Sequence, residues 1–208
     1  METLEAWDRA IVLAVNGWHQ PWLDEVMWII SGKLTWLPIW LLFLYWAFLK
    51  LERKHFWIFL ICALASIGIA DLTAKILFKD LIQRYRPSHN LLLINQLHFF
   101  EEYPGTFYRG GIYGFISNHA SNFFAILSWV VVLFWNSKRW FVYVMLGAAV
   151  LVAFSRLYLG VHYLSDLTVG ALWGISISYL AVCPVSVFPD CLQIIMEVFH
   201  MPRCFPIF

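Results

Sequence analysis

Charged residues are scarce in this sequence. Asp, Glu, Lys and Arg make up 13% of the 208 residues, whereas a soluble domain usually carries about 25%. The two signs nearly cancel to a formal net charge of +1, which argues against a broad cationic surface for nucleic acid. Hydrophobic residues, by contrast, reach 62%. This composition is typical of a polytopic membrane protein with short loops.

Cysteine is also rare, and its spacing fits neither a metal site nor a disulfide framework. The four cysteines are Cys62, Cys183, Cys191 and Cys204, and we expect them to be unpaired. The N-terminus starts acidic without a basic n-region, so we do not expect a cleaved signal peptide. Internal repeats and low-complexity tracts are lacking, and we therefore expect one domain over residues 1–208.

Long apolar runs predict the membrane-spanning core, residues 34–184. Crossing a bilayer takes about 20 apolar residues, and about 17 is the practical lower end. Five runs are candidates: residues 34–49, 55–78, 117–135, 140–155 and 163–184. Backbone groups in hydrocarbon must be satisfied internally, so each span must be helical. We expect an all-α bundle of five, or six, transmembrane helices.

The two ends of the chain have a different pattern. Residues 6–31 carry four charges (Asp8, Arg9, Asp24 and Glu25), with Gly17 and Pro21 between two apolar pieces. This favours two short interfacial or re-entrant helices over another span. In the tail, residues 185–208, polar side chains at Gln193, Glu197 and His200 suggest an amphipathic helix on the membrane.

Loop charge predicts the orientation. Basic residues gather in two loops that alternation puts on one side: Lys50, Arg53, Lys54, Lys138 and Arg139. The positive-inside rule assigns that side to the cytoplasm. The opposite side is basic as well, with Arg84, Arg86, Arg109 and Arg156, but the chemistry described below explains several of these arginines. Residues 80–116 and 156–162 then face outward, which is the periplasmic side in a bacterial inner membrane.

Three polar clusters fall on this outward side: "KDLIQRYRP" at 79–87, "ISNHAS" at 116–121 and "SRLYLGVHYLSD" at 155–166. Ionisable groups near a bilayer are costly and are by default a hint of function. Lys79, Arg86 and Arg156 can surround a phosphate, since guanidinium forks suit its oxygens. The helix N-termini expected near residues 118 and 163 also favour an anion.

The histidines supply the remaining chemistry. His162 and Asp166 are four residues apart and are expected on one helix face. The carboxylate can accept from one imidazole nitrogen, which leaves the other nitrogen free to attack. His119, from a different helix, can protonate the departing oxygen as a general acid.

These residues resemble the type 2 phosphatidic acid phosphatase family, whose signature has three parts. The first part, Lys, six residues, then Arg-Pro, is matched by Lys79, Arg86 and Pro87. The third part, Ser-Arg, five residues, His, three residues, Asp, is matched by Ser155, Arg156, His162 and Asp166. The second part is normally Pro-Ser-Gly-His and reads Ile116-Ser117-Asn118-His119 here, so the proline and glycine differ.

The resemblance implies a phosphatase that uses no metal and no cofactor and works through a phosphohistidine. It makes His162 the nucleophile, Asp166 the group that orients it, and His119 the acid and later the base. Four side chains would hold the phosphoryl oxygens: Lys79, Arg86, Arg156 and Ser117. The family also uses a backbone N–H that falls on Asn118. If that contact operates here, Asn118→Gly is expected to preserve or raise activity.

Several polar residues have structural interpretations. Asp71 and Lys75 are expected to pair with each other, or alternatively Asp71 tunes Lys79. Gly170 and Gly174 share a ridge with Asp166 and are expected to allow close helix packing. His89 and His98 are expected to be solvated loop residues; a metal site with Glu101 and Glu102 is the alternative.

The expected substrate is a lipid phosphate or diphosphate, because the site lies at the interface with membrane lipids. Undecaprenyl diphosphate is the first candidate; lipid A, phosphatidylglycerophosphate and phosphatidic acid follow. A non-catalytic lipid-phosphate binder or transporter is an alternative of another class. A third alternative is halide oxidation with bound vanadate, as in soluble relatives of the family. The sequence does not indicate an oligomeric state.

Overall fold

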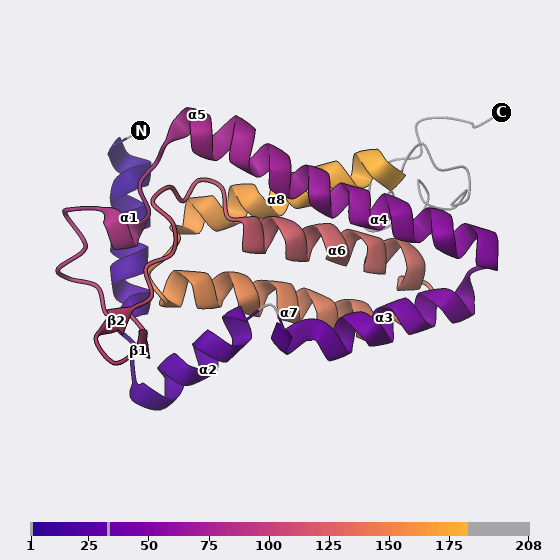
Figure 1. Ribbon diagram of the computed structural model, residues 1–208, viewed down its shortest axis with the longest axis horizontal. Coiled ribbons are helices and arrows are strands. Elements are labelled where there is room, and N and C mark those ends of the chain that lie inside the picture. Colours follow the sequence, from indigo (N-terminus) through magenta and orange to yellow (C-terminus); the bar gives the residue numbers. More distant parts are fainter. Residues whose placement is uncertain (1, 33, 183–208) are drawn as a thin grey trace.

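The computed structural model describes residues 2–32 and 34–182, and this part of the chain is mostly helical (Figure 1). The α-helices are α1 (Glu2–Asn16), α2 (Pro21–Ser31), α3 (Leu37–Lys50), α4 (Arg53–Thr73), α5 (Asp80–Ile82), α6 (Asn118–Phe134), α7 (Arg139–Tyr158) and α8 (Leu164–Val182). Short 3-10 turns cover Leu34–Trp36 and Pro87–His89, and a π-helical segment covers Ala74–Lys79. Strands β1 (Glu101–Tyr103) and β2 (Thr106–Phe107) form a small antiparallel hairpin.

Three helices in the described residues are long and apolar enough to cross a membrane. They are α7, α8 and the continuous stretch Arg53–Ile82, which joins α4 to α5. A fourth span arises if α2 and α3, bent by 71°, count as one. All five predicted runs are helical over nearly all of their described residues. Helices α3 and α6, with 14 and 17 residues, are too short to cross a membrane by themselves. The helical fold is confirmed, with three or four candidate spans.

Helix α6 lies in the middle of the bundle, against α4, α7 and α8 (Figure 1). Its contact with α8 depends on two glycines, as the sequence predicted. A Cβ atom at Gly174 would stand 2.0 Å from the Ser121 carbonyl oxygen, and one at Gly170 would stand 2.6 Å from that of Ser117. Small residues allow backbones this close in membrane bundles. The first turns of α6 and α8 therefore lie together, and the Ser117 N–H donates to the Asp166 carbonyl at 3.0 Å.

Aromatic packing fills the other half of the bundle, between α3, α4, α6 and α7. Phe59 packs edge-on against Trp129, whose indole N–H donates to the Ser66 hydroxyl at 2.9 Å. Large apolar side chains such as Leu41, Ile61, Leu64 and Val150 face outward instead. Lipid is as apolar as these side chains, so helix association depends on packing and interhelical hydrogen bonds.

The segment between α5 and α6 covers one end of the bundle, beside α1 (Figure 1). Two backbone hydrogen bonds pin it: the Arg86 N–H donates to the Ile112 carbonyl at 3.0 Å, and the Gly114 N–H to the Arg84 carbonyl at 2.9 Å. The two helices predicted within residues 1–32 are present as α1 and α2. The tail prediction, residues 185–208, lies outside the described residues.

Candidate active site

His162 and Asp166 meet where the turn after α7 enters α8. Gly160, with φ of +66°, supplies the left-handed backbone of this turn. Because α8 begins at Leu164, His162 precedes the helix, and the expected shared helix face is wrong. The two side chains nevertheless approach each other: His162 Nδ1 stands 3.4 Å from Asp166 Oδ2, with both side chains buried, and this contact lacks hydrogen-bond geometry. The same oxygen accepts the Tyr163 N–H at 3.0 Å, which caps α8 and fixes the carboxylate.

Arg86 determines which nitrogen of His162 carries a proton. Its Nη1 lies 2.7 Å from His162 Nε2, and a guanidinium group can only donate. Nε2 must therefore accept, which leaves the proton on Nδ1, toward Asp166. Burial, followed by the charges of Arg86 and Arg156, holds the pKa of His162 well below its ordinary value. At neutral pH the ring is neutral, and its basic nitrogen faces the guanidinium.

Two arginines bring buried positive charge to this ring. Arg86 is 8% exposed and also donates to the Val161 carbonyl at 2.9 Å. Burial and neighbouring Arg156 lower the pKa of Arg86 to about 10, so it stays charged at neutral pH. Arg156 is 3% exposed and donates to the hydroxyls of Ser31 and Tyr108.

Several buried polar atoms at this end have no hydrogen-bond partner among the described residues. They include Nε of Arg86, Nε of Arg156 and the Ser117 hydroxyl. Buried polar groups are nearly always satisfied, so each such group calls for an explanation. An anion with several acceptor oxygens, such as a phosphoryl group, suits two guanidinium donors and a hydroxyl.

Lys79 reaches the site from the last residue of the π-helical segment. Its ammonium donates to the side-chain oxygen of Asn118, the first residue of α6. The Asn118 amide in turn donates to Asp71 Oδ1 at 2.5 Å, and Asn122 donates to the same oxygen at 3.3 Å. Among the described residues, Asp71 accepts hydrogen bonds from these two asparagines and not from Lys75. This favours the alternative that Asp71 acts on Lys79 through Asn118.

His119 lies in the first turn of α6 and is half-buried. Its charge, like that of Lys79, is close enough to lower the pKa of His162. The eight residues singled out from the sequence therefore gather where α6 and α8 begin and α7 ends: Lys79, Arg86, Ser117, Asn118, His119, Arg156, His162 and Asp166. The helix starts predicted near residues 118 and 163 are confirmed within one residue.

Three further residues support the carboxylate and were missed in the sequence. Arg84 donates to Asp166 Oδ1 at 2.9 Å and to Asp8 Oδ2 at 2.8 Å. Asp8, 2% exposed on α1, accepts the Ser165 N–H at 3.0 Å and also the Ser165 hydroxyl. A second arginine two residues before Arg86 was a local signal. The pairing of Asp8 with Arg84 had no such signal, because 76 residues separate the two in the sequence.

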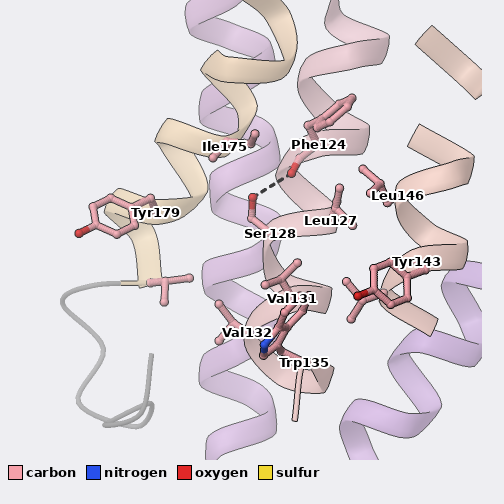
Figure 2. Close-up of a pocket in the computed structure, with 12 residues that line it drawn as sticks. Phe124, Leu127, Ser128, Val131, Val132, Trp135, Tyr143, Leu146, Ile175 and Tyr179 are labelled. Atoms are coloured by element: carbon pink, nitrogen blue, oxygen red, sulfur yellow. Dashed lines mark hydrogen bonds between the residues drawn. The ribbon is translucent and has the colours of Figure 1, made fainter. Parts of the chain in front are cut away.

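An apolar pocket lies between α6, α7 and α8, toward the C-terminal end of α6 (Figure 2). Its lining includes Leu127, Val131, Leu146 and Ile175. The one hydroxyl on its α6 wall, that of Ser128, donates to the Phe124 carbonyl at 2.9 Å. None of the eight site residues lines this pocket, so it is separate from the polar cluster.

Comparisons with known proteins agree with the motifs. A family model for the PAP2 superfamily matches residues 57–187. The chain is 32% identical over 181 residues to a lipid A 4'-phosphatase of Porphyromonas gingivalis, covering 86% of this chain and 73% of that protein. It is 33% identical over 178 residues to a lipid A 4'-phosphatase of Bacteroides thetaiotaomicron, covering 84% and 75%.

Solved structures share the fold. A PAP2 type phosphatidylglycerolphosphate phosphatase from Bacillus subtilis superposes with a TM-score of 0.62 at 23% identity, covering 99% of this chain and 90% of that one. LpxE from Aquifex aeolicus gives a TM-score of 0.58 at 18% identity, covering 84% and 93%. With the family match across the membrane core and all three motifs in one cluster, this chain belongs to the PAP2 superfamily and is a membrane phosphatase of that family.

Proposed function

We propose that this enzyme removes a phosphate monoester from a lipid A-type glycolipid at the membrane surface. The observation that carries the proposal is the buried His162 ring, whose Nε2 is kept unprotonated beside two arginines. Two relatives at 32% and 33% identity, both lipid A 4'-phosphatases, support this lipid class. Undecaprenyl diphosphate, the first expectation from the sequence, has no such support. Phosphatidylglycerophosphate and phosphatidic acid are secondary candidates.

In the proposed first step, the phosphate enters between Arg86, Arg156 and Lys79, and its oxygens replace His162 Nε2 as the acceptor for Arg86. Nε2 then attacks phosphorus while the bond from phosphorus to the lipid oxygen breaks. His119 gives its proton to that oxygen. Asp166 accepts from Nδ1 and stabilises the positive charge that develops on the ring.

In the second step, water attacks the phosphohistidine and His119 takes a proton from it. The N–P bond breaks, inorganic phosphate leaves and His162 returns to its neutral state. Ser117 and the backbone N–H of Asn118 contribute donors at the start of α6, where first-turn amides have no acceptor within the helix. Every group in this scheme belongs to the chain or the substrate, so it uses no metal ion.

The proposed location is a bacterial inner membrane, with the site facing the periplasm. Two helix junctions, α3–α4 and α6–α7, lie at the end of the bundle opposite the site (Figure 1). They carry Lys50, Arg53, Lys138 and Arg139. Lys50 donates to the Leu133 carbonyl and Lys138 lies over the Trp46 ring, so both cations belong to that end. By the positive-inside rule, this end of the bundle faces the cytoplasm in the proposed orientation. We propose that residues 1–208 act as one domain.

The test is phosphate release by the purified protein in detergent with EDTA present. Lipid A, undecaprenyl diphosphate, phosphatidylglycerophosphate and phosphatidic acid are the substrates. We expect wild type to hydrolyse lipid A faster than the other lipids. The control variant His55→Ala, changed at the opposite end of the molecule, should behave in the same way. His162→Ala should release no phosphate. A faster reaction with another lipid would overturn the proposal that lipid A is the substrate. Release that survives in His162→Ala would overturn the mechanism, and binding without release by folded wild type would favour the non-catalytic alternative.

A further inference from the structure

Three potential metal ligands meet outside the phosphatase cluster. His19 lies in the turn between α1 and α2, Asp24 in the first turn of α2, and His98 in the long connection between α5 and α6. One ligand atom from each lies within 4.8 Å of the other two. His98, expected from the sequence to be a solvated loop residue, instead contacts Asp24, with 3.0 Å from its Nε2 to Oδ2.

The backbone of His98 is fixed by the buried side chain of Asn16. The amide of Asn16 donates to the His98 carbonyl at 2.8 Å, and its oxygen accepts the His98 N–H at 2.8 Å. The same amide donates to the Tyr158 carbonyl at 2.8 Å. Asn16 therefore holds the connection, the end of α1 and the end of α7 together.

The carboxylate of Asp24 is oriented in the way that a metal ligand is. Its Oδ1 accepts the Tyr158 hydroxyl at 2.5 Å, and Tyr158 is 2% exposed. Oδ2 is left to face the imidazole of His98. Carboxylates that bind a metal are themselves typically hydrogen-bonded by an outer-shell partner of this kind.

The two imidazoles lie face to face at the surface. The rings of His19 and His98 stack with centroids 4.2 Å apart and planes 15° apart. Two protonated rings at this distance would repel each other, whereas two neutral rings can share a cation. Both side chains are exposed, so an ion can reach them from solvent.

We propose that His19, Asp24 and His98 bind a zinc ion, with water as the fourth ligand. Two imidazoles and a carboxylate are ligands that zinc accepts, at bond lengths of about 2.0–2.2 Å. Ligand atoms around a tetrahedral ion then stand about 3.3–3.5 Å apart. To bind one ion, the two exposed rings must turn out of their stacked arrangement so that a lone pair of each points at the metal.

The bound ion would clamp the long connection to the α1–α2 turn. Further along this connection, the Tyr108 hydroxyl accepts from Arg156 at 2.7 Å, and Trp28 of α2 stacks on Phe100 at 4.7 Å. Zinc is therefore expected to stabilise the loop over the site without entering the chemistry. This inference does not depend on the proposed function.

The test is zinc binding by the full chain, purified in detergent and stripped with EDTA, in competition with a chromophoric chelator. We expect wild type and His55→Ala to bind one ion with the same affinity. Removing an outer-shell partner typically lowers metal affinity by about 10–100-fold. His19→Ala and His98→Ala, which each remove a ligand, should lower the zinc affinity by more than that. Asp24→Asn, which keeps the side-chain size, tests the third ligand. Circular dichroism and elution volume in EDTA show that each variant is folded.

Cobalt provides a second measurement that needs no variant. Co²⁺ bound to wild type should give the intense visible bands of a four-coordinate site, and zinc should displace it. Unchanged zinc affinity in folded His19→Ala and His98→Ala would overturn the proposal. The weak bands of hydrated, six-coordinate cobalt on wild type would overturn it as well. Limited proteolysis should show that zinc protects residues 90–110 in wild type, and equal cleavage with and without zinc would contradict the clamp.

Discussion

Arg86 Nη1 lies 2.7 Å from His162 Nε2, so a cation occupies the position that the phosphorus atom takes in the proposed reaction. Substrate oxygens must therefore draw this guanidinium away from the ring before attack. An arginine can do so while keeping contact with the phosphate, because its donors form a planar fork. Arg86 thus sets the tautomer of His162, and in the proposed reaction it also receives the substrate.

Arg86→Lys is expected to lower kcat/KM by about 100-fold. The lysine ammonium cannot make the paired contact with the phosphate and lacks the donor that selects the tautomer of His162. A hydrogen bond to a charged group contributes about 1.5–3 kcal/mol. The matched control is Arg139→Lys at the opposite end of the molecule, with unchanged kinetics. Steady-state phosphate release measures both. Equal effects of the two substitutions would contradict the assigned role of Arg86.

The bridge from Asp8 through Arg84 to Asp166 positions the carboxylate. Asp8→Asn is expected to reduce the free energy of unfolding by about 3 kcal/mol, because it breaks a buried ion pair, and to lower kcat with KM little changed. Glu5→Gln is the control, since Glu5 forms an exposed pair with Arg9 on the same helix and should cost at most about 1 kcal/mol. A change in KM alone would argue against positioning.

Close packing of α6 against α8 is tested at two glycines. Gly174→Ala would place a Cβ atom 2.0 Å from the Ser121 carbonyl oxygen, and we expect it to destabilise the protein by about 2 kcal/mol or more and to lower activity. Gly147→Ala, on α7, meets nothing within 4 Å and should be neutral or stabilising by up to about 1 kcal/mol. Thermal unfolding in detergent compares them, and equal shifts would contradict the packing.

Asn118 provides a prediction that changes once the structure is considered. Its side chain links Lys79 to Asp71, so Asn118→Gly is now expected to lower kcat/KM by about 10-fold, the equivalent of one charged hydrogen bond. Asn122→Ala removes the longer contact to Asp71 and should have a smaller effect. Preserved or raised activity in Asn118→Gly would show that the backbone N–H alone matters, as the family resemblance implies.

The pKa of His162 predicts how stability depends on pH. The folded ring is held well below its ordinary pKa, whereas the unfolded ring titrates near pH 6.5. Below that pH the unfolded state binds a proton that the folded state does not, so stability falls as pH decreases from about 7. Wild type should lose up to about 1.4 kcal/mol per pH unit more than His162→Gln. Parallel curves for the two proteins would contradict a neutral buried ring.

The sequence was sufficient for the helical fold and for choosing eight residues that lie together in space, because apolar length and motif spacing are local patterns. Their roles in the reaction stay predictions. It was insufficient for contacts between distant segments, such as Asp8 with Arg84 and His98 with Asp24, since no local pattern encodes them. The prediction that His162 and Asp166 share a helix face was wrong, because the chain turns at Gly160 and α8 begins only at Leu164. The four-residue spacing fitted a helix, but the two side chains meet because the Asp166 carboxylate caps the start of α8.

The most direct test of the central claim is capture of the phosphohistidine. Wild type is mixed with lipid A carrying ³²P at its phosphate, quenched in alkaline detergent and digested. We predict an acid-labile, base-stable label on the peptide that contains His162, absent from His162→Ala and present in His55→Ala. Turnover of the lipid with no label on His162, or label on another residue, would contradict the account.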